Sequence, residues 1–231
     1  MKTERKPRTV RYSRMDVLNR LFEEALVPVF YHPDVETVRR VVSALDAAGA
    51  SMLEFVNRGD QAIEVFKETV KFCRKNLPGF VVGAGSIVDE ATAALYVAQG
   101  AEFIVGPSFN ERVARFCNRR KVPYIPGCQT ATEISIAEEM GVEIVKLFPG
   151  AVSGGPEFVK QILGPSPWTK ILPTSLGKVT AESVAAWFDS GVCAVGMWPE
   201  LIPHEHVESG DFDAITRCTA EIREWVRAAR G

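Results

Sequence analysis

The chain of 231 residues has room for one large domain or two small ones, and its hydrophobic fraction of 46% is enough for a buried core. The formal net charge of −2 offers no basic surface for nucleic acid or for an anionic membrane. No apolar run approaches the ~20 residues that span a bilayer. We therefore expect neither a nucleic-acid partner nor a membrane partner.

The first residues of the chain are rich in basic side chains, but no apolar stretch follows that would make them a secretory signal. We interpret residues 1–14 as a flexible lead-in to one domain that covers residues 15–231. The five cysteines are scattered without a C-x-x-C pair, which favours the reducing cytoplasm over a disulfide framework or a zinc site. His204 and His206 flank Glu205 in a stretch typical of a surface loop, and a lone His-x-His is weak grounds for a metal.

Short apolar segments and amphipathic segments alternate along the chain after a first helix at residues 15–24. The predicted strands are residues 26–31, 52–56, 80–84, 103–105, 124–126, 144–148, 171–173 and 194–196. The predicted helices between them are residues 35–48, 61–75, 90–99, 111–119, 131–139, 157–163 and 181–189, and a last helix covers 212–229. Glycines stand just after several helical patterns, where helices commonly end: Gly49, Gly100, Gly141 and Gly191.

This repeated strand–helix alternation indicates parallel strands joined by crossover helices. The chain is close to the ~250 residues typical of a (β/α)8 barrel. An open doubly wound sheet alternates in the same way, but it normally has a Gly-rich first turn, and here the first strand leads into His32-Pro33-Asp34. We therefore predict an α/β protein with a (β/α)8 TIM barrel in a single domain, preceded by an N-terminal helix.

The predicted strand at 144–148 carries a lysine in the middle of an apolar run. An ammonium group is costly to bury, so Lys146 is expected to be partly neutral, and a neutral amine is the nucleophile that forms a Schiff base with a ketone. A lysine whose stem lies in the core and whose head group reaches solvent or a carboxylate has the same pattern. Taken alone, this strand favours the second, structural interpretation.

Other polar groups follow the predicted strands at their C-terminal ends, where barrels carry their chemistry. Glu54 alternates with Leu53 and Phe55, so it faces the opposite way, either as a working carboxylate or in a structural ion pair, for example with Lys146. Arg58 lies in the next loop, where a guanidinium can clamp a carboxylate or stay solvated. Because the amine, the acid and the guanidinium come from different strands at one mouth, the set as a whole favours a catalytic lysine.

Standard phosphate and metal motifs are missing from the sequence. The segment Gly83-Ala84-Gly85-Ser86 is small enough for a ligand to approach the backbone, but such glycines alone are weak grounds. Gly177-Lys178 is no phosphate loop, because Leu172 and Val179 occupy the positions that require a glycine and a hydroxyl residue. Strand ends carry no Asp/His set for a divalent metal. We predict neither a metal nor a cofactor.

Together these residues resemble the 2-keto-3-deoxy-6-phosphogluconate (KDPG) / 4-hydroxy-2-oxoglutarate (KHG) aldolases, which are class I pyruvate aldolases on a (β/α)8 barrel. The similarity runs from about residue 16 to residue 227. The motifs that carry it are Leu53-Glu54-x-x-x-Arg58, Gly83-Ala84-Gly85-Ser86, Pro126-Gly127, Glu133, Val145-Lys146-Leu147-Phe148-Pro149 and Pro173-Thr174.

The resemblance implies that Lys146 forms a Schiff base with the keto carbon of pyruvate, that Glu54 shuttles protons through a water, and that Arg58 clamps the pyruvate carboxylate. The other substrate-binding positions that it implies are Ser86 (usually threonine in the family), Pro107, Phe148, Thr174, Ser175 and Gly196. It also implies a homotrimer that acts on a small keto acid without a metal.

The sequence departs from the family in the loops after strands seven and eight. The family usually has Thr-Gly-Gly in the first loop and Gly-Gly-Ser or Gly-x-Gly-Ser in the second, and their backbone N–H groups hold a distal phosphate. Here the loops read Thr174-Ser175-Leu176 and Gly196-Met197-Trp198-Pro199. We expect the side chains of Leu176 and Met197 to prevent backbone approach and Trp198 to narrow the mouth, which weakens the phosphate site.

The sequence therefore predicts a cytoplasmic class I aldolase that cleaves a 2-keto-4-hydroxy acid reversibly to pyruvate and an aldehyde. The alternative is a catalytically degenerate barrel that acts as a binding or assembly protein, because the altered loops leave room for lost turnover. A sugar-phosphate isomerase or epimerase on the same fold is disfavoured by those loops and by the missing metal ligands.

Overall fold

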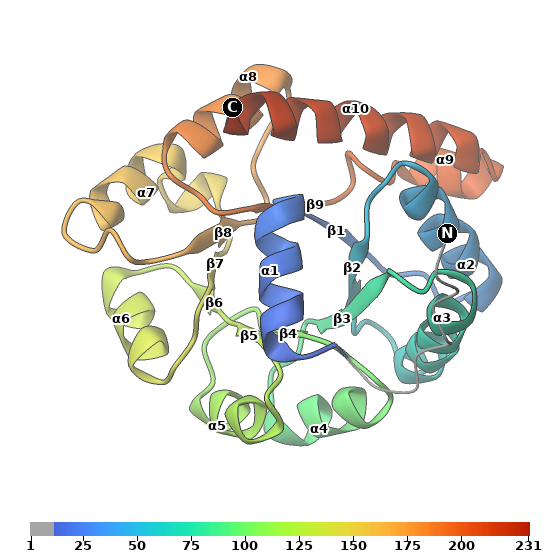
Figure 1. The fold of residues 1–231 in the computed structure, drawn as a ribbon, viewed down its shortest axis with the longest axis horizontal. Helices are drawn as coiled ribbons and strands as arrows, with labels where there is room; N and C mark the ends of the chain where they lie inside the picture. Colours follow the sequence, from blue (N-terminus) through green and yellow to red (C-terminus); the bar gives the residue numbers. More distant parts are fainter. Residues whose placement is uncertain (1–11) are drawn as a thin grey trace, which may run out of the picture.

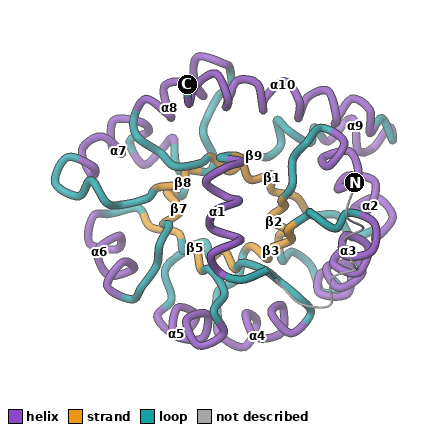
Figure 2. Tube along the Cα trace, viewed as in Figure 1, coloured by secondary structure: helices purple, strands orange, loops and turns teal. Residues whose placement is uncertain are grey.

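The computed structural model describes residues 12–231, and its strands form the inner wall of a barrel that helices surround (Figures 1 and 2). The strands are β1 Leu26–Phe30, β2 Met52–Val56, β3 Val81–Gly85, β4 Ile104–Val105, β5 Tyr124–Ile125, β6 Gly127–Cys128, β7 Val145–Leu147, β8 Ile171–Pro173 and β9 Val195–Met197. The helices are α1 Arg14–Glu24, α2 Val35–Ala47, α3 Ala62–Asn76, α4 Glu90–Ala98, α5 Glu111–Arg120, α6 Ala131–Glu139, the 3-10 helix η1 Ala151–Ser153, α7 Gly155–Leu163, α8 Ala181–Asp189, α9 His204–Ser209 and α10 Phe212–Arg230.

The strands pair in parallel, in two hydrogen-bonded sheets that together complete the barrel. One sheet has the order β5-β4-β3-β2-β1-β9 and the other the order β6-β7-β8. The N–H of Cys193 donates to the carbonyl of Ile171 at 3.0 Å and joins β8 to the segment that leads into β9. This arrangement confirms the predicted (β/α)8 barrel.

The fifth strand, predicted at residues 124–126, corresponds to β5, and the structure continues it beyond Pro126 as β6. Proline has no N–H to donate to a neighbouring strand, but its carbonyl accepts a hydrogen bond from the N–H of Lys146 at 2.8 Å. The N–H of Gly127 donates to the carbonyl of Gly106 at 2.9 Å. Since both pieces pair with their neighbours, they form one wall strand between β4 and β7.

Helix α2 illustrates how the sequence attaches the outer ring to the wall. Asp34 is the N-cap of this helix, and its carboxylate accepts a hydrogen bond from the N–H of Thr37 at 2.7 Å. Val38, Val41 and Leu45 recur at three- and four-residue spacing and are fully buried. Each such side chain stabilises the fold by roughly 1.5–3 kcal/mol.

Helix α1 lies across one end of the barrel (Figure 1). Because β1 begins directly after it, the covered end is the one where the strands start. Val17, Leu18 and Leu21 are buried beneath the helix. The C-terminal ends of the strands form the opposite mouth of the barrel.

The described chain begins and ends near the covered end. The hydroxyl of Tyr12 donates to the carbonyl of Pro78 at 2.9 Å, just before β3. At the end of α10, Arg230 donates to the carbonyls of Phe22 and Glu23 at 2.7 and 2.8 Å. These contacts fix both ends of the described chain to the side of the barrel that α1 covers.

The boundary between the expected lead-in and the domain lies earlier than residue 15. Ser13 caps α1 through its side chain, and Arg14 pairs with Glu143 at 2.7 Å. Residues 13 and 14 therefore belong to the folded domain. Residues 1–11 of the expected lead-in lie outside the described residues.

The prediction of a surface loop around His204 and His206 is wrong, because this segment forms the short helix α9. Pro203 stands at its start and Gly210 adopts the left-handed conformation (φ 72°) at its end. The imidazole Nδ1 of His204 lies 3.2 Å from a carboxylate oxygen of Glu208 on the next turn. Within residues 12–231, no group of three or more His, Cys, Asp and Glu side chains is placed to hold a metal ion.

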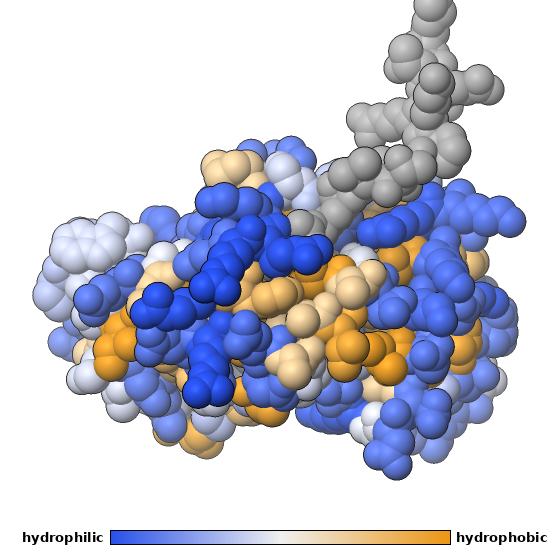
Figure 3. Space-filling view, turned by 90° about the horizontal axis from the view of Figure 1, so that it is seen from below, coloured by the Kyte–Doolittle hydropathy of each residue, from blue (hydrophilic) through white to orange (hydrophobic). Residues whose placement is uncertain are grey.

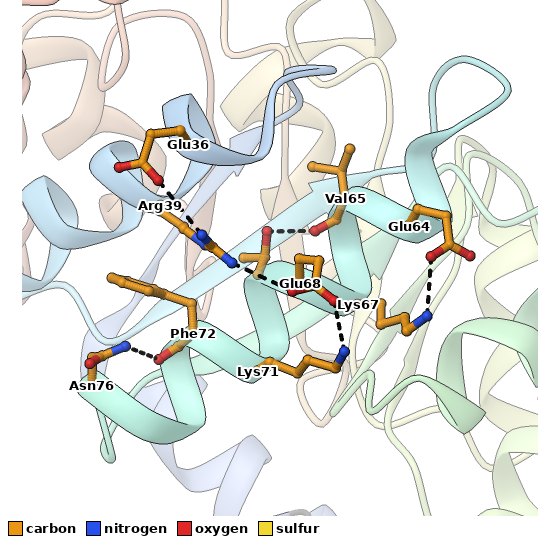
Figure 4. Close-up of polar contacts among 10 residues, drawn as sticks. Glu36, Arg39, Glu64, Val65, Lys67, Glu68, Lys71, Phe72 and Asn76 are labelled. Atoms are coloured by element: carbon orange, nitrogen blue, oxygen red, sulfur yellow. Dashed lines mark hydrogen bonds and ion pairs between the residues drawn. The ribbon is translucent and has the colours of Figure 1, made fainter.

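The outer surface carries both hydrophilic and apolar residues. Hydrophilic residues with apolar ones between them cover the face seen in Figure 3. Figure 4 shows a series of ion pairs along α2 and α3: Arg39 with Glu36 at 3.7 Å and with Glu68 at 3.5 Å, Lys71 with Glu68 at 2.7 Å, and Lys67 with Glu64 at 3.2 Å. Across residues 12–231, none of the helices combines the length and the apolar character needed to cross a bilayer.

Candidate active site

A cavity of about 110 Å³ opens at the C-terminal mouth of the barrel. Every residue that the sequence analysis proposed as catalytic or substrate-binding contributes to its wall. The lining residues are Val29, Glu54, Val56, Arg58, Ser86, Pro107, Lys146, Phe148, Thr174, Ser175, Gly196 and Trp198. The barrel thus brings together side chains that are up to 169 positions apart, from Val29 to Trp198.

An amine and a carboxylate are in contact on the floor of this cavity. Nζ of Lys146, on β7, lies 3.3 Å from Oε1 and 3.5 Å from Oε2 of Glu54, on β2. The two side chains are only 10% and 4% exposed. The ring of Phe148 lies 5.4 Å from the amine, close enough for a cation–π contact. A buried contact of this kind lets a proton pass between the two groups with little water present.

Two glycines of β3, Gly83 and Gly85, leave room for side chains of neighbouring strands or loops. A Cβ at Gly85 would lie 2.2 Å from Oε1 of Glu54, and a Cβ at Gly83 would lie 2.4 Å from the ring of Phe103. The small residues of this segment were weak grounds for a ligand approaching the backbone. In the structure, the space beside Gly85 holds the Glu54 carboxylate and the space beside Gly83 holds a core phenyl ring.

Hydrogen bonds of Asn57, the residue before Arg58, hold the start of the loop that carries both residues in place. The side-chain oxygen of Asn57 accepts a hydrogen bond from the hydroxyl of Tyr96 at 2.8 Å, and its N–H donates to the carbonyl of Gly85 at 2.9 Å. Burial raises the pKa of Tyr96 to about 12, so the hydroxyl stays a donor at neutral pH. Sequence reasoning missed this tether; the polar Asn57 directly after a strand was the one available signal.

Two serines of the cavity wall adopt the left-handed backbone conformation, Ser86 with φ 58° and Ser175 with φ 57°. Non-glycine residues rarely do so, and such positions tend to cluster at functional sites. Ser86 follows β3 and Ser175 follows β8, so both aim short hydroxyl side chains at the mouth from strand ends.

Leu176 and Met197 were expected to block access to the backbone at the mouth, and Trp198 to narrow the mouth. The structure supports only the placement of Trp198. Leu176 and Met197 are buried in the hydrophobic core and do not line the cavity. The physical reason for Met197 is strand alternation: Gly196 faces the cavity, so its neighbour faces the helices. Trp198 does line the cavity, as expected. Thr174 fills the space beside Gly196 with its methyl group, and its buried hydroxyl makes no hydrogen bond to the described residues.

Sequence reasoning also missed Val29 and Val56 as lining residues. Val29 is paired in register with Glu54 across β1 and β2, and Val56 follows Glu54 by two positions on the same strand. Strand alternation alone therefore places both on the face that carries the carboxylate. They add apolar surface around the amine.

A second hollow, of about 310 Å³, lies on the outer surface between α2, α3 and α10. Its two arginines already have partners: Arg39 pairs with Glu68, and the guanidinium of Arg40 stacks 3.9 Å from the ring centroid of Phe212. No buried amine or thiol lines it. This outer hollow therefore lacks the buried amine–carboxylate contact found at the mouth of the barrel.

A parallel barrel with a buried amine–carboxylate contact at its C-terminal mouth defines the class of this protein, a TIM barrel with its polar residues gathered where such barrels carry their active sites. The family follows from comparison with known proteins. A model of the KDPG and KHG aldolase family matches residues 17–218, and the chain belongs to that family.

Individual relatives agree over nearly the whole chain. The 2-dehydro-3-deoxy-phosphogluconate aldolase of Pseudomonas aeruginosa is 30% identical over 214 residues, 92% of this chain and 93% of that protein. That of Haemophilus influenzae is 27% identical over 217 residues, 94% of this chain and 99% of that protein. The structure of KDPG aldolase from Legionella pneumophila, with pyruvate captured at low pH as a covalent carbinolamine intermediate, matches with a TM-score of 0.79 at 25% identity, over 88% of this chain and 96% of that one.

Proposed function

We propose that this chain is a class I aldolase that cleaves a 2-keto-4-hydroxy acid reversibly to pyruvate and an aldehyde. The observation that carries the proposal is the buried contact of 3.3 Å between Nζ of Lys146 and Oε1 of Glu54 inside a barrel of the KDPG and KHG aldolase family. In this proposal Lys146 is the nucleophile, Glu54 moves protons, and Arg58 holds the carboxylate of the keto acid.

The proposed reaction begins with attack of the Lys146 amine on the keto carbon of the substrate. The carbinolamine that forms loses water and gives an iminium. The C3–C4 bond then breaks, its electron pair moves into the iminium to leave an enamine, and the proton of the C4 hydroxyl passes to a base as the aldehyde departs. The enamine gains a proton at C3, and water releases pyruvate and the free amine. The contact between Glu54 and Lys146 supports Glu54 as the group that makes these proton transfers.

We further propose that the distal phosphate site of the family is weakened in this chain. The resemblance implies that the family holds this phosphate with backbone N–H groups of glycine-rich loops, whereas here the loops after β8 and β9 line the cavity with Ser175 and Trp198. A phosphate at the far end would therefore meet hydroxyl and apolar side chains. The test compares kcat/KM for the 6-phosphorylated sugar acid and for its unphosphorylated analogue; a strong preference for the phosphorylated compound refutes this part of the proposal.

Trapping with borohydride and pyruvate tests the aldolase itself. Reduction of a Schiff base adds the pyruvate carbons covalently, and mass spectrometry of peptides should find the addition on Lys146. The Lys146→Met variant should gain none, whereas Lys178→Ala, which removes an exposed lysine outside the cavity, should be labelled as the wild type is. Absence of labelling in the wild type would favour the binding or assembly protein instead.

We propose a homotrimer in the cytoplasm. Several large apolar side chains are exposed and available for subunit contacts: Val88, Leu95, Ile136 and Val152. All five cysteines are free thiols, as is usual in a reducing compartment. Light scattering should give about three times the chain mass of 25.4 kDa, and a mass of one or two chains would contradict the trimer.

A further inference from the structure

The cavity at the mouth has a buried floor and an exposed rim. The floor is formed by Glu54, Lys146, Thr174 and Gly196, which are buried. The exposed lining residues form the rim: Arg58, Pro107, Ser175 and Trp198. The proposed covalent chemistry takes place on the floor, so the rim is what the remaining part of a substrate meets.

The enclosed volume is too small for a whole sugar-acid substrate. The cavity measures about 110 Å³, less than the roughly 150 Å³ of a protein cavity that binds one benzene molecule. A pyruvate unit bonded to Lys146 fills most of this space. The aldehyde half, beyond the C3–C4 bond, must then extend past the floor and lie against the rim.

The rim offers one cation and one large aromatic surface. Arg58 is its single charged residue, and under the proposed function it is occupied by the carboxylate of the keto acid. Trp198, 42% exposed, is the largest side chain of the rim, and Pro107 adds apolar surface. An aldehyde half with a charged end would find no free opposite charge among these residues, whereas an uncharged planar group would gain contact with the indole.

We infer that Trp198 determines specificity, and that the preferred substrates are 2-keto-4-hydroxy acids whose C4 substituent is uncharged and apolar, aromatic groups above all. This inference rests on the proposed function and names the substrate class of the same site. Trp198 binds the departing aldehyde rather than the keto acid. Its contribution therefore depends on which aldehyde is released.

The test measures pyruvate release from three substrates that share the keto-acid half. At C4 they carry a phenyl group, a dihydroxyethyl group, or a phosphorylated dihydroxyethyl group. In the wild type, kcat/KM should be highest for the phenyl compound. In Trp198→Ala, the ratio of kcat/KM for the phenyl compound to that for the dihydroxyethyl compound should fall about tenfold, since an aromatic contact is lost. Because the ratio is compared between the variant and the wild type, the difference in intrinsic reactivity between the two substrates cancels.

Two further variants make the result specific. Trp198→Phe keeps an aromatic ring and should hold the ratio within about twofold of the wild-type value. Trp168→Ala removes another exposed tryptophan (66%), which does not line the cavity, and should leave the ratio unchanged. A preference for the phosphorylated compound, or an equal loss on all three substrates in Trp198→Ala, overturns the inference.

Trapping of pyruvate on wild-type Lys146 separates this inference from the function on which it rests. If pyruvate is trapped but the ratio does not depend on Trp198, the specificity inference alone falls. If pyruvate is not trapped, the proposed aldolase falls and the inference falls with it.

Discussion

The ion pair at the mouth of the barrel and the ion pairs along α2 and α3 contain the same chemical groups in different surroundings. Lys146 and Glu54 are 10% and 4% exposed and come from opposite walls of the barrel. Lys67 and Glu64, a pair on the outer surface of α3, are 35% and 61% exposed and stand one helical turn apart (Figure 4). The distance from the lysine nitrogen to the nearest carboxylate oxygen is nearly the same in the two pairs, 3.3 Å at the mouth and 3.2 Å on α3.

Distance alone does not set the energy of such a contact. Water and salt screen the surface pair, and each charged group is solvated by water. Removal of one partner therefore changes the free energy of unfolding little. The pair at the mouth has lost most of its water, so removal of one partner leaves the other group buried without compensation.

Glu54→Ala should lower the free energy of unfolding by about 3 kcal/mol, because Lys146 is then left buried without its carboxylate. The double variant Glu54→Leu/Lys146→Met should recover most of this loss, since neither charge remains. Urea denaturation followed by circular dichroism measures both. If the single variant were no less stable than Lys67→Ala, the contrast between the two regions would be broken.

Gly85→Ala should disturb the same pair from the neighbouring strand. The added methyl group would lie 2.2 Å from Oε1 of Glu54, so the carboxylate must move. We expect a loss of roughly 1–3 kcal/mol in stability and about a 10²-fold fall in kcat/KM for aldol cleavage, because a misplacement of about 1 Å has effects of this size. Gly79→Ala, where an added Cβ has no neighbour closer than 3.9 Å, is the matched control for a glycine replacement.

Asp89, the N-cap of α4, lies between the two extremes. It accepts a hydrogen bond from the N–H of Thr92 at 2.8 Å, and this bond, followed by the one from the Thr92 hydroxyl, lowers the pKa of the Asp89 carboxyl. Asp89→Ala should cost about 1 kcal/mol near neutral pH.

The pH dependence of this cap has a definite sign. A lowered pKa in the folded state means that the stabilisation is present above the unfolded value of about 4 and is lost as the pH falls through the folded value. Asp89→Asn keeps a capping side chain without a titrating group. Between pH 5 and pH 3, the stability of the wild type should therefore fall more steeply than that of Asp89→Asn, and equal slopes would contradict the assignment.

Lys67→Ala should produce the smallest change. A solvent-exposed pair on adjacent turns of a helix contributes about 0.3–0.5 kcal/mol, and added salt should reduce even this. Denaturation in low and high salt measures the effect. A loss as large as that of Glu54→Ala would show that burial does not separate the two regions.

Much of the barrel could be predicted from the sequence because its strands and helices repeat strong local patterns. Each predicted strand lies within about one residue of an observed one, and the helices at 131–139 and 181–189 coincide with α6 and α8. Helix α9 was missed because it is bounded by Pro203 and Gly210 and has no buried residue, so it lacks the apolar periodicity that marks longer helices.

The site was predictable where a polar residue interrupts an apolar strand, as Lys146 and Glu54 do. It was not predictable where the outcome depends on contacts between distant strands. The space beside Gly85 is taken by Glu54, 31 positions earlier, and Tyr96 reaches back to Asn57, 39 positions away. Leu176 lies beyond the end of β8, where strand alternation no longer fixes the direction of a side chain.

The attachment of Tyr12 and Arg230 to the α1 side of the barrel has a practical consequence for anyone who handles this protein. A fusion partner, an affinity tag or a surface linker joined after residue 231 would project from the base, away from the opening above Lys146. Immobilised by that end, the protein would present its opening to the bulk solution.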